Sequence, residues 1–306
     1  IKGELEALIE KFPERRKTRM ASDEDVLEFN EEAYIARENT NVVLTRNGYI
    51  KRVGRLASVE TTRVKEGDEV VAVIPGSTLD HVVFFAEDGA AYTMRMNEVP
   101  ATAGHGEPIT KFFKLGDGVK VVSAVTTDPR FTPADLPAKG DTPAGPYLVV
   151  ATKNGFVLRL PLTAFRSEST KVGRRFVKLE EGDKVVMVRL AGAEEGVMLA
   201  TAGGFVTHFP VDQVSILSGP GKGVIGIELE PADDCLGGVL VGDRFSKLVV
   251  ETESGKQQDF GPGAVKTRKR GAKGEKPGSR TRFTRVVPPD IQLADWDAVE
   301  GRKKDE

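Results

Sequence analysis

The sequence has very little cysteine, histidine and tryptophan, and this scarcity excludes several kinds of site. A single cysteine, Cys235, cannot form a disulfide within the chain, so nothing indicates an oxidising compartment. The three histidines, His81, His105 and His208, lie far apart and lack the spacing of zinc ligands. We therefore expect neither a metal ion nor a cofactor in this chain.

Long apolar runs are also lacking. No stretch approaches the roughly 18 apolar residues of a membrane-spanning helix, and no charged segment followed by an apolar one marks a secretory signal. We expect a cytoplasmic protein without a membrane partner. The chain starts with Ile1 rather than Met, which we interpret as the start of a fragment of a longer protein.

The charge is small in total but unevenly distributed. The formal net charge of -2 excludes a uniformly basic protein. Residues 21–40 contain seven acidic residues and one basic residue, whereas residues 266–285 contain nine basic residues and one acidic residue, Glu275. A glycine-containing basic segment of this kind favours contact with phosphate groups without reading of bases.

The sequence does contain an internal repeat. Five segments each combine an apolar β-branched run, a polar turn and a second strand, with turn glycines at Gly48, Gly89, Gly155, Gly204 and Gly255. Asn-Gly or Asp-Gly pairs, which favour tight hairpin turns, occur at the first three. The glycines are 41, 66, 49 and 51 residues apart, as in propeller blades. The sequence thus predicts an all-β, five-bladed, propeller-like disc.

The same pattern places the domain boundaries. Apolar residues at helical spacing predict a short helix within residues 1–20, which Pro13 would interrupt. An acidic linker follows at 21–40, then the disc at 41–298 and a charged tail at 299–306. We expect the Pro-rich insertion 128–146 to be an exposed loop. The predicted blades are about 41–80, 81–146, 147–195, 196–246 and 247–298.

The hairpins GYIKR at 48–52 and GFVLR at 155–159 resemble the β-pinwheel repeats in the C-terminal region of the type IIA DNA topoisomerase A subunit, in gyrase or topoisomerase IV. The opening IKGELEALIEKFPERRKT also resembles the end of the coiled-coil arm in that family. The resemblance implies blades that exchange strands and a basic rim that bends and wraps duplex DNA without sequence preference. It also implies a nucleoid-associated, ATP-dependent parent enzyme, with the remaining A-subunit domains and the ATPase B subunit as partners.

The resemblance further implies that this fragment is not catalytic, because the DNA-cleaving tyrosine of the family belongs to another domain. One departure concerns the glycine-rich basic box that follows the first hairpin in gyrases. Here that stretch reads LASVETTRVKEGD, and a box-like KTRKRGAKG occurs instead at 266–274. We interpret the difference as favouring a topoisomerase IV-like enzyme, with the later segment closing the DNA wrap.

Candidate DNA contacts fall into two groups: the basic segment near the C-terminus, and cations in or after the hairpins. The fourth residue after the turn glycine is cationic in the first and third repeats, Arg52 and Arg159, and His208 in the fourth. Both groups also have an ordinary interpretation, as a solvated loop or as exposed strand residues. The candidates are Lys266, Arg268, Lys269, Arg270, Lys273, Lys276, Arg280, Arg282, Lys51, Arg52, Arg159, Arg174, Arg175 and Lys222.

Two other functions remain open at this point. The chain could be a propeller module that binds proteins or peptides through its central face, or a structural spacer that docks on the topoisomerase core. A propeller hydrolase would need converging carboxylates or a metal cluster, and the sequence indicates neither. The nine cations within residues 266–285 favour DNA binding over these alternatives.

Overall fold

The computed structural model describes residues 1–12, 35–192, 194, 196–242, 245–277 and 281–301. It divides into two compact units, Ile1–Ile35 and Ala36–Glu306. The first contains α1 (Lys2–Lys11), which ends shortly before Pro13 and is exposed along its length. Most of the predicted acidic linker, residues 21–34, lies outside the described residues. Within the described part of the chain, no helix is long and apolar enough to cross a membrane.

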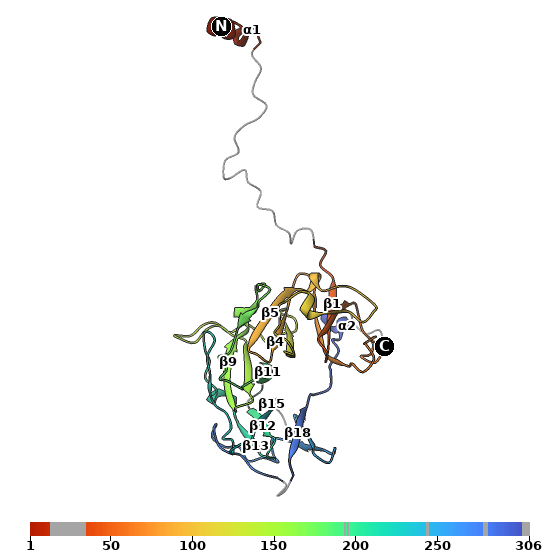
Figure 1. The fold of residues 1–306 in the computed structure, drawn as a ribbon, viewed down its shortest axis with the longest axis vertical. Helices are drawn as coiled ribbons and strands as arrows, with labels where there is room; N and C mark the ends of the chain where they lie inside the picture. The colour runs from red at the N-terminus through yellow and green to blue at the C-terminus, as the bar shows by residue number, and fades with distance from the viewer. Residues whose placement is uncertain (13–34, 193, 195, 243–244, 278–280, 302–306) are drawn as a thin grey trace. The chain divides into compact units, whose positions relative to one another are not determined.

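The second unit consists of five small antiparallel sheets, which confirms the predicted five-bladed β-pinwheel (Figure 1). In each blade a hairpin is followed by a third strand that pairs with the first. All five predicted turn glycines have φ between 76° and 87°, a conformation that glycine adopts without strain. The blades comprise β1 (Asn39–Thr45), β2 (Tyr49–Val53) and β3 (Val70–Ser77); β4 (His81–Ala86), β5 (Ala90–Arg95) and β7 (Val121–Thr126); β8 (Tyr147–Thr152), β9 (Phe156–Pro161) and β11 (Val185–Ala191); β12 (Gly196–Thr201), β13 (Val206–Pro210) and β15 (Cys235–Val241); and β16 (Leu248–Thr252), β17 (Gln257–Phe260) and β18 (Phe283–Val287).

Each blade from the second onward also contributes a short segment to the edge of the blade before it. The segments β6 (Glu107–Pro108), β10 (Arg174–Arg175) and β14 (Val224–Ile225) pair with β2, β5 and β9. The last blade does the same through the bridges His208↔Thr267 and Val206↔Glu275. We call these four pieces the exchanged segments: residues 104–108, 171–175, 221–225 and 266–276. The strand exchange implied by the family resemblance is therefore present.

The core lies between successive blades, in four apolar clusters. Alternation along a strand explains this arrangement, because side chains of a strand point to opposite faces in turn. In β4, Phe84 packs into the cluster with the first blade, whereas Phe85 packs into the cluster with the third. Phe85 meets the rings of Phe165 and Phe176 edge-on at 5.4 and 5.1 Å. The third strands β3, β7, β11, β15 and β18 contact one another in this order around the ring.

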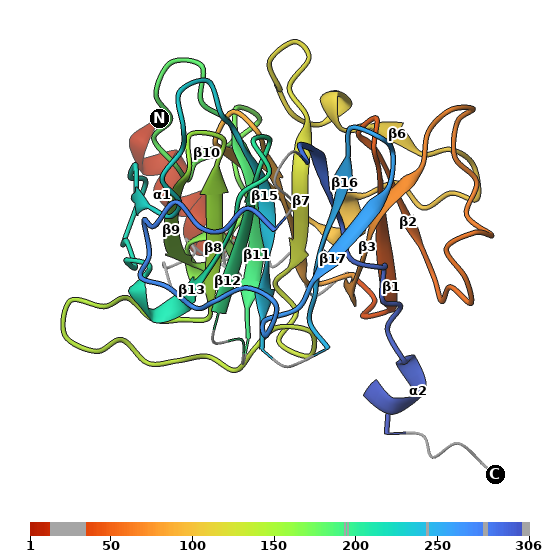
Figure 2. The ribbon, with the colours of Figure 1, turned by 90° about the horizontal axis from the view of Figure 1, so that it is seen from below.

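The end of the chain returns from the last blade to the first (Figure 2). The short helix α2 (Trp296–Val299) follows β18. Arg55 pairs with Asp297 and Glu300 at 2.8 Å each, and Asn39 donates to Glu300 at 2.8 Å. The segment before the predicted tail and the start of the tail itself are thus attached to the first blade.

The Pro-rich insertion is only partly the exposed loop that was expected. Residues 134–141 are exposed, but Asp128 at its start is fully buried. Phe131 packs edge-on against Trp296 at 5.3 Å. This ring contact holds the start of the loop against the C-terminal helix.

Candidate nucleic-acid interface

The exchanged segments bring cations to equivalent places on successive blades. Each segment has a glycine with positive φ, at Gly106, Gly173, Gly223 and Gly274. A Cβ at Gly106, Gly223 or Gly274 would lie 2.4–2.5 Å from a backbone oxygen of the preceding hairpin, so glycine allows the close approach. The cations flanking these glycines therefore lie along the outer edges of blades 2, 3 and 4, each within two residues of the glycine. They are Lys171, Arg174 and Arg175 on blade 2, Lys222 on blade 3, and Lys273 and Lys276 on blade 4.

The first blade interrupts this series. Its exchanged segment carries His105 and Glu107 around Gly106 and contains no lysine or arginine, whereas each later segment contains at least one. The basic positions thus run over the edges of blades 2 to 4. We call them the cationic edge.

Several of these cations lie over aromatic rings. The Nζ of Lys222 is 4.3 Å from the ring centre of Phe156, and the Nζ of Lys273 is 5.0 Å from that of Phe205. Both phenylalanines directly follow a turn glycine. Sequence reasoning missed this arrangement, although the aromatic residue after the glycine was its visible signal. The rings hold the lysine stems in place while the ammonium groups remain exposed.

In the last exchanged segment the cations divide into paired and unpaired ones. Arg268 pairs with Glu275 at 2.9 Å, and Lys273 with Glu230 at 2.5 Å. Arg270 donates to the backbone carbonyls of Gln213 and Ile225. In the described structure, no carboxylate pairs with the exposed side chains of Lys266, Lys269 and Lys276. These three lysines can therefore bind phosphate without first losing an ion pair.

The same distinction applies to the other candidates outside the hairpins. Lys222 pairs with Glu180 at 2.7 Å, and Arg282 pairs with Glu253 at 3.4 Å. Arg174 donates to the carbonyl of Ala164 and Arg175 to that of Asp88. Arg280 lies outside the described residues.

The predicted hairpin cations are engaged within the protein. Lys51 is 2% exposed, and its Nζ donates to the carbonyls of Arg63 and Gly104 at 2.7 Å each. Burial, and then the positive charge of Arg63, lower the pKa of Lys51. This burial argues against the predicted phosphate contact for Lys51.

Arg52 and Arg159 hold the blade junctions. Their Nε atoms donate to the carbonyls of Val99 at 3.3 Å and Val214 at 2.8 Å, which are equivalent positions in the next blade. Desolvation lowers the pKa of Arg159. Both guanidinium groups keep some exposure, but their main contacts are structural.

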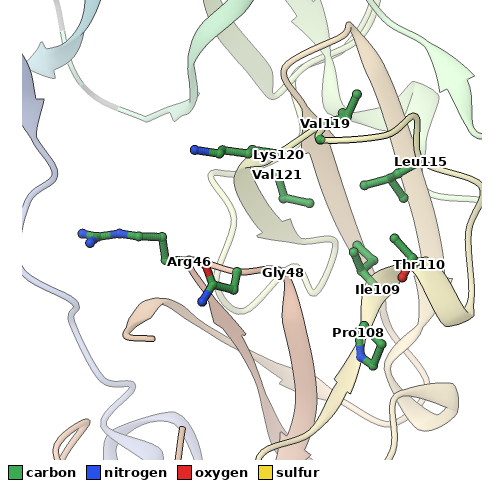
Figure 3. Close-up of a pocket in the computed structure, with 11 residues that line it drawn as sticks. Arg46, Gly48, Pro108, Ile109, Thr110, Leu115, Val119, Lys120 and Val121 are labelled. Carbon is green, nitrogen blue, oxygen red and sulfur yellow. The ribbon is translucent and has the colours of Figure 1, made fainter. Parts of the chain in front are cut away.

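Two features of the described residues bear on possible chemistry: a cavity beside the first hairpin turn and the thiol of Cys235. A cavity of about 240 Å³ lies where the first hairpin turn meets the second blade, and the side chains of Ile109, Leu115 and Val121 line it (Figure 3). Arg46 and Lys120 extend away from these apolar groups. Among the described residues no cluster of His, Cys, Asp and Glu could hold a metal ion. Burial raises the pKa of the Cys235 thiol to about 12, which keeps it protonated.

Comparison with known proteins agrees with this architecture. Residues 80–128, 146–190 and 197–241, which form blades 2, 3 and 4, match the family model of the DNA gyrase C-terminal domain, a beta-propeller. The DNA gyrase A subunit of Staphylococcus epidermidis (strain ATCC 12228 / FDA PCI 1200) is 28% identical over 297 residues, covering 92% of this chain and 31% of the relative. The chain is similar to the C-terminal region of the DNA gyrase A subunit. This confirms the resemblance to type IIA topoisomerase A subunits.

A second relative, the DNA gyrase A subunit of Haloquadratum walsbyi, is 24% identical over 274 residues, covering 85% of this chain and 31% of the relative. The chain thus spans about a third of the length of the curated relatives it matches. The C-terminal domain of DNA topoisomerase IV has the same fold, with a TM-score of 0.70 and 22% identity over 83% of this chain and 78% of that one. The E. coli ParC C-terminal domain follows with a TM-score of 0.63 and 22% identity, over 82% of this chain and 98% of that one.

Proposed function

We propose that this β-pinwheel binds duplex DNA along the cationic edge, without sequence preference, and bends it around the ring. The observation that carries the proposal is that equivalent exchanged segments each bring at least one cation to the outer edges of blades 2, 3 and 4. Cations spaced along successive blades neutralise successive phosphates but do not read base edges. In the parent protein, a type IIA topoisomerase, the bound DNA is presented to the strand-passage core formed by the other A-subunit domains and the ATPase subunit.

The chain itself contributes binding rather than chemistry. DNA cleavage and ATP hydrolysis belong to other domains of the parent, and the fragment needs no cofactor for its part. The described cavity with apolar walls in Figure 3 offers neither paired carboxylates nor an activated nucleophile.

A salt titration with a variant that lacks three lysines of the exchanged segments tests the proposal. Because roughly six phosphates are neutralised, DNA affinity should fall about 10³-fold between 50 and 200 mM salt. Lys171→Ala/Lys266→Ala/Lys276→Ala should weaken binding to every sequence and reduce the slope of log K against log salt by about 0.9 for each lost contact. Fluorescence anisotropy with two duplexes of unrelated sequence measures both effects.

The control variant Lys139→Ala/Lys184→Ala/Lys247→Ala removes the same charge from residues outside the exchanged segments. It should leave the slope nearly unchanged. Equal losses in the two variants would mean that only net charge matters, which contradicts a defined edge. A flat salt titration of the unmodified chain would favour the protein-interaction alternative.

A further inference from the structure

The third strands of all five blades share a β-bulge, which allows their residues to be aligned. The extra residue is Val71, Val122, Val186, Leu236 and Thr284 in blades 1 to 5. Three residues later the aligned position is Ile74, Val125, Val239 and Val287 in four blades. In the third blade it is Arg189. One repeat thus places an arginine where the others have an aliphatic side chain.

Arg189 lines a cavity of about 190 Å³ in the middle of the ring. The cavity is bounded by the third strands of four blades, including Val122 of β7, Leu236 of β15 and Val286 of β18. Arg189 is the one charged residue in this lining, which consists otherwise of aliphatic side chains, glycine and proline. The cavity beside Arg189 is thus bounded by several blades, and no other charged residue lines it.

The guanidinium of Arg189 has no partner among the described residues. No hydrogen bond or ion pair involves it, whereas buried or half-buried Arg130 and Arg159 both have several. Desolvation alone lowers the pKa of Arg189, and no carboxylate contributes to that shift. Arginine nevertheless stays protonated in proteins. A half-buried positive charge without a counter-charge is unfavourable unless an anion or water solvates it.

The neighbouring blade leaves room for such an anion. Gly237 and Gly238 of β15 line the same cavity, and β7 and β11 have larger residues at the aligned positions, Ser123–Ala124 and Met187–Val188. Gly237 has φ of +126°, and a Cβ at Gly238 would lie 2.0 Å from the carbonyl oxygen of Met198. Both glycines are therefore required by the backbone, and their lack of side chains enlarges the space beside Arg189.

Backbone groups add further donors. β11 and β15 are edge strands of their sheets, so alternate N–H groups along them are not used in sheet pairing. An arginine fork together with free N–H groups is the kind of donor set that binds a tetrahedral oxyanion. The described lining contains no acidic group that would repel it.

We propose that the centre of the ring holds a small-oxyanion site, in which the guanidinium of Arg189 binds an ion of the size and charge of inorganic phosphate. The site is separate from the cationic edge, because β11 lies at the opposite side of its sheet from β9 and β14. DNA bound at the outer edge would therefore not occupy it. The anion would tie the third, fourth and fifth blades together from inside the ring and stabilise the folded state.

Thermal unfolding of the full 306-residue chain in inorganic phosphate, compared with chloride at equal pH and ionic strength, tests the proposal. Phosphate should raise the melting temperature of the unmodified chain above its value in chloride, in a saturable manner. Arg189→Leu, which introduces an aliphatic residue as in the other repeats, should abolish this difference. The control Arg285→Leu removes an exposed arginine of the equivalent third strand that pairs with Glu251. It should keep the difference.

An equal phosphate response in Arg189→Leu and the unmodified chain would place the ion at the outer lysines and overturn the proposal. A second measurement does not depend on the folding of the leucine variant. The Nε–Hε NMR signal of Arg189, assigned from its loss in Arg189→Lys, should shift on phosphate addition and saturate. A signal that does not respond to phosphate overturns the proposal even if DNA binding at the cationic edge is present.

Discussion

At the scale of single residues, polar side chains of the hairpins hold neighbouring blades together. The fourth residue after the turn glycine contacts the connection of the next blade in at least three repeats. Arg52 and Arg159 donate to backbone carbonyls, and His208 Nδ1 lies 3.1 Å from Thr267 Oγ1. A cation on a hairpin is therefore a weak indicator of DNA contact, and an unpaired lysine on an exchanged segment is a stronger one.

Asp128 is the clearest case of a buried charge with a structural role. Its side chain is fully buried and pairs with Arg130, whose Nη2 is 2.6 Å from Oδ2. Burial alone would raise the pKa of Asp128, but the hydrogen bonds from the Arg130 side chain and backbone outweigh it and lower the pKa below its usual value. Arg130 also lies 5.9 Å from the ring centre of Trp296, so this pair supports the attachment of the C-terminal helix.

We predict that Asp128→Asn lowers the free energy of unfolding by about 3 kcal/mol at neutral pH, because Arg130 then loses its buried partner. The contribution of Asp128 is present above the unfolded-state pKa of about 3.9 and is lost as the pH falls through the lower folded pKa. Urea unfolding at pH 7 and in the acid range measures both effects.

Asp135→Asn provides the control, because Asp135 pairs with Arg166 at the surface, where it is 60% exposed. Its effect should stay below about 1 kcal/mol. Similar losses in the two variants, or an unchanged acid limb in Asp128→Asn, would contradict the role assigned to Asp128.

At the scale of elements, each exchanged segment depends on a glycine that lets it approach the preceding hairpin. The first connection, residues 54–69, differs from the others in this respect. Gly67 is its glycine with positive φ, and a Cβ there would meet nothing within 4 Å. The connection folds against its own blade, where Lys51 holds the carbonyl of Arg63. The first connection therefore adds no strand to the last blade, and in the described structure β17 pairs with β16 alone.

We predict that Gly223→Ala lowers both stability and DNA affinity. Gly223 has φ of +82°, and a Cβ would lie 2.4 Å from the carbonyl oxygen of Val157. The left-handed conformation alone costs alanine about 1–2 kcal/mol, and the close contact adds to it. Displacement of the segment would also move Lys222 away from the cationic edge. Chemical denaturation and DNA anisotropy measure the two losses.

Gly219→Ala is a matched control, since a Cβ at Gly219 meets nothing within 4 Å and its φ is not positive. It should leave both quantities almost unchanged. Normal DNA affinity in a correctly folded Gly223→Ala protein would show that the position of this segment is irrelevant to binding.

At the scale of the whole molecule, continuity of the cationic edge decides whether DNA is merely bound or also bent. Bending 20–30 base pairs by 40–90° costs on the order of 1–6 kcal/mol, so contacts must continue to the far end of the bend. The last exchanged segment lies at the blade 4 end of the cationic edge and carries the unpaired Lys266, Lys269 and Lys276. It is placed to provide the terminal contacts.

We predict that Lys266→Ala/Lys269→Ala/Lys276→Ala reduces DNA bending more than it reduces affinity for a short duplex. A short duplex does not extend around the ring, so it loses only local contacts. Energy transfer between the ends of a long duplex measures bending, and anisotropy of a short duplex measures affinity. Lys139→Ala, in the exposed Pro-rich loop, should change neither.

Equal losses in bending and affinity would identify the last segment as a simple docking patch. An absence of any loss would leave the paired cations Arg268, Arg270 and Lys273, or the blade 2 edge, as the principal contacts. Either result would contradict the role of this segment in extending the bend.

The sequence alone predicted the five hairpins, their turn glycines and the basic last segment. These features depend on neighbours in the chain: strand alternation has a period of two residues, and Asn-Gly or Asp-Gly pairs favour positive φ wherever they occur. The family resemblance added strand exchange, and the pairing of β10 with β5 and of β14 with β9 is consistent with it.

Only the tertiary structure decided which cations are free, because pairing depends on segments supplied by the next blade. Arg159 and Lys269 have the same charge in the sequence. The connection that follows the hairpin of blade 4 covers Arg159, whereas Lys269 is exposed. Burial of Lys51 by residues of its own connection and of the next, and isolation of Arg189 at the ring centre, likewise arise from contacts between distant segments. The sequence determined the repeating unit by local backbone preferences, whereas the charges available for binding were determined by how neighbouring units cover one another.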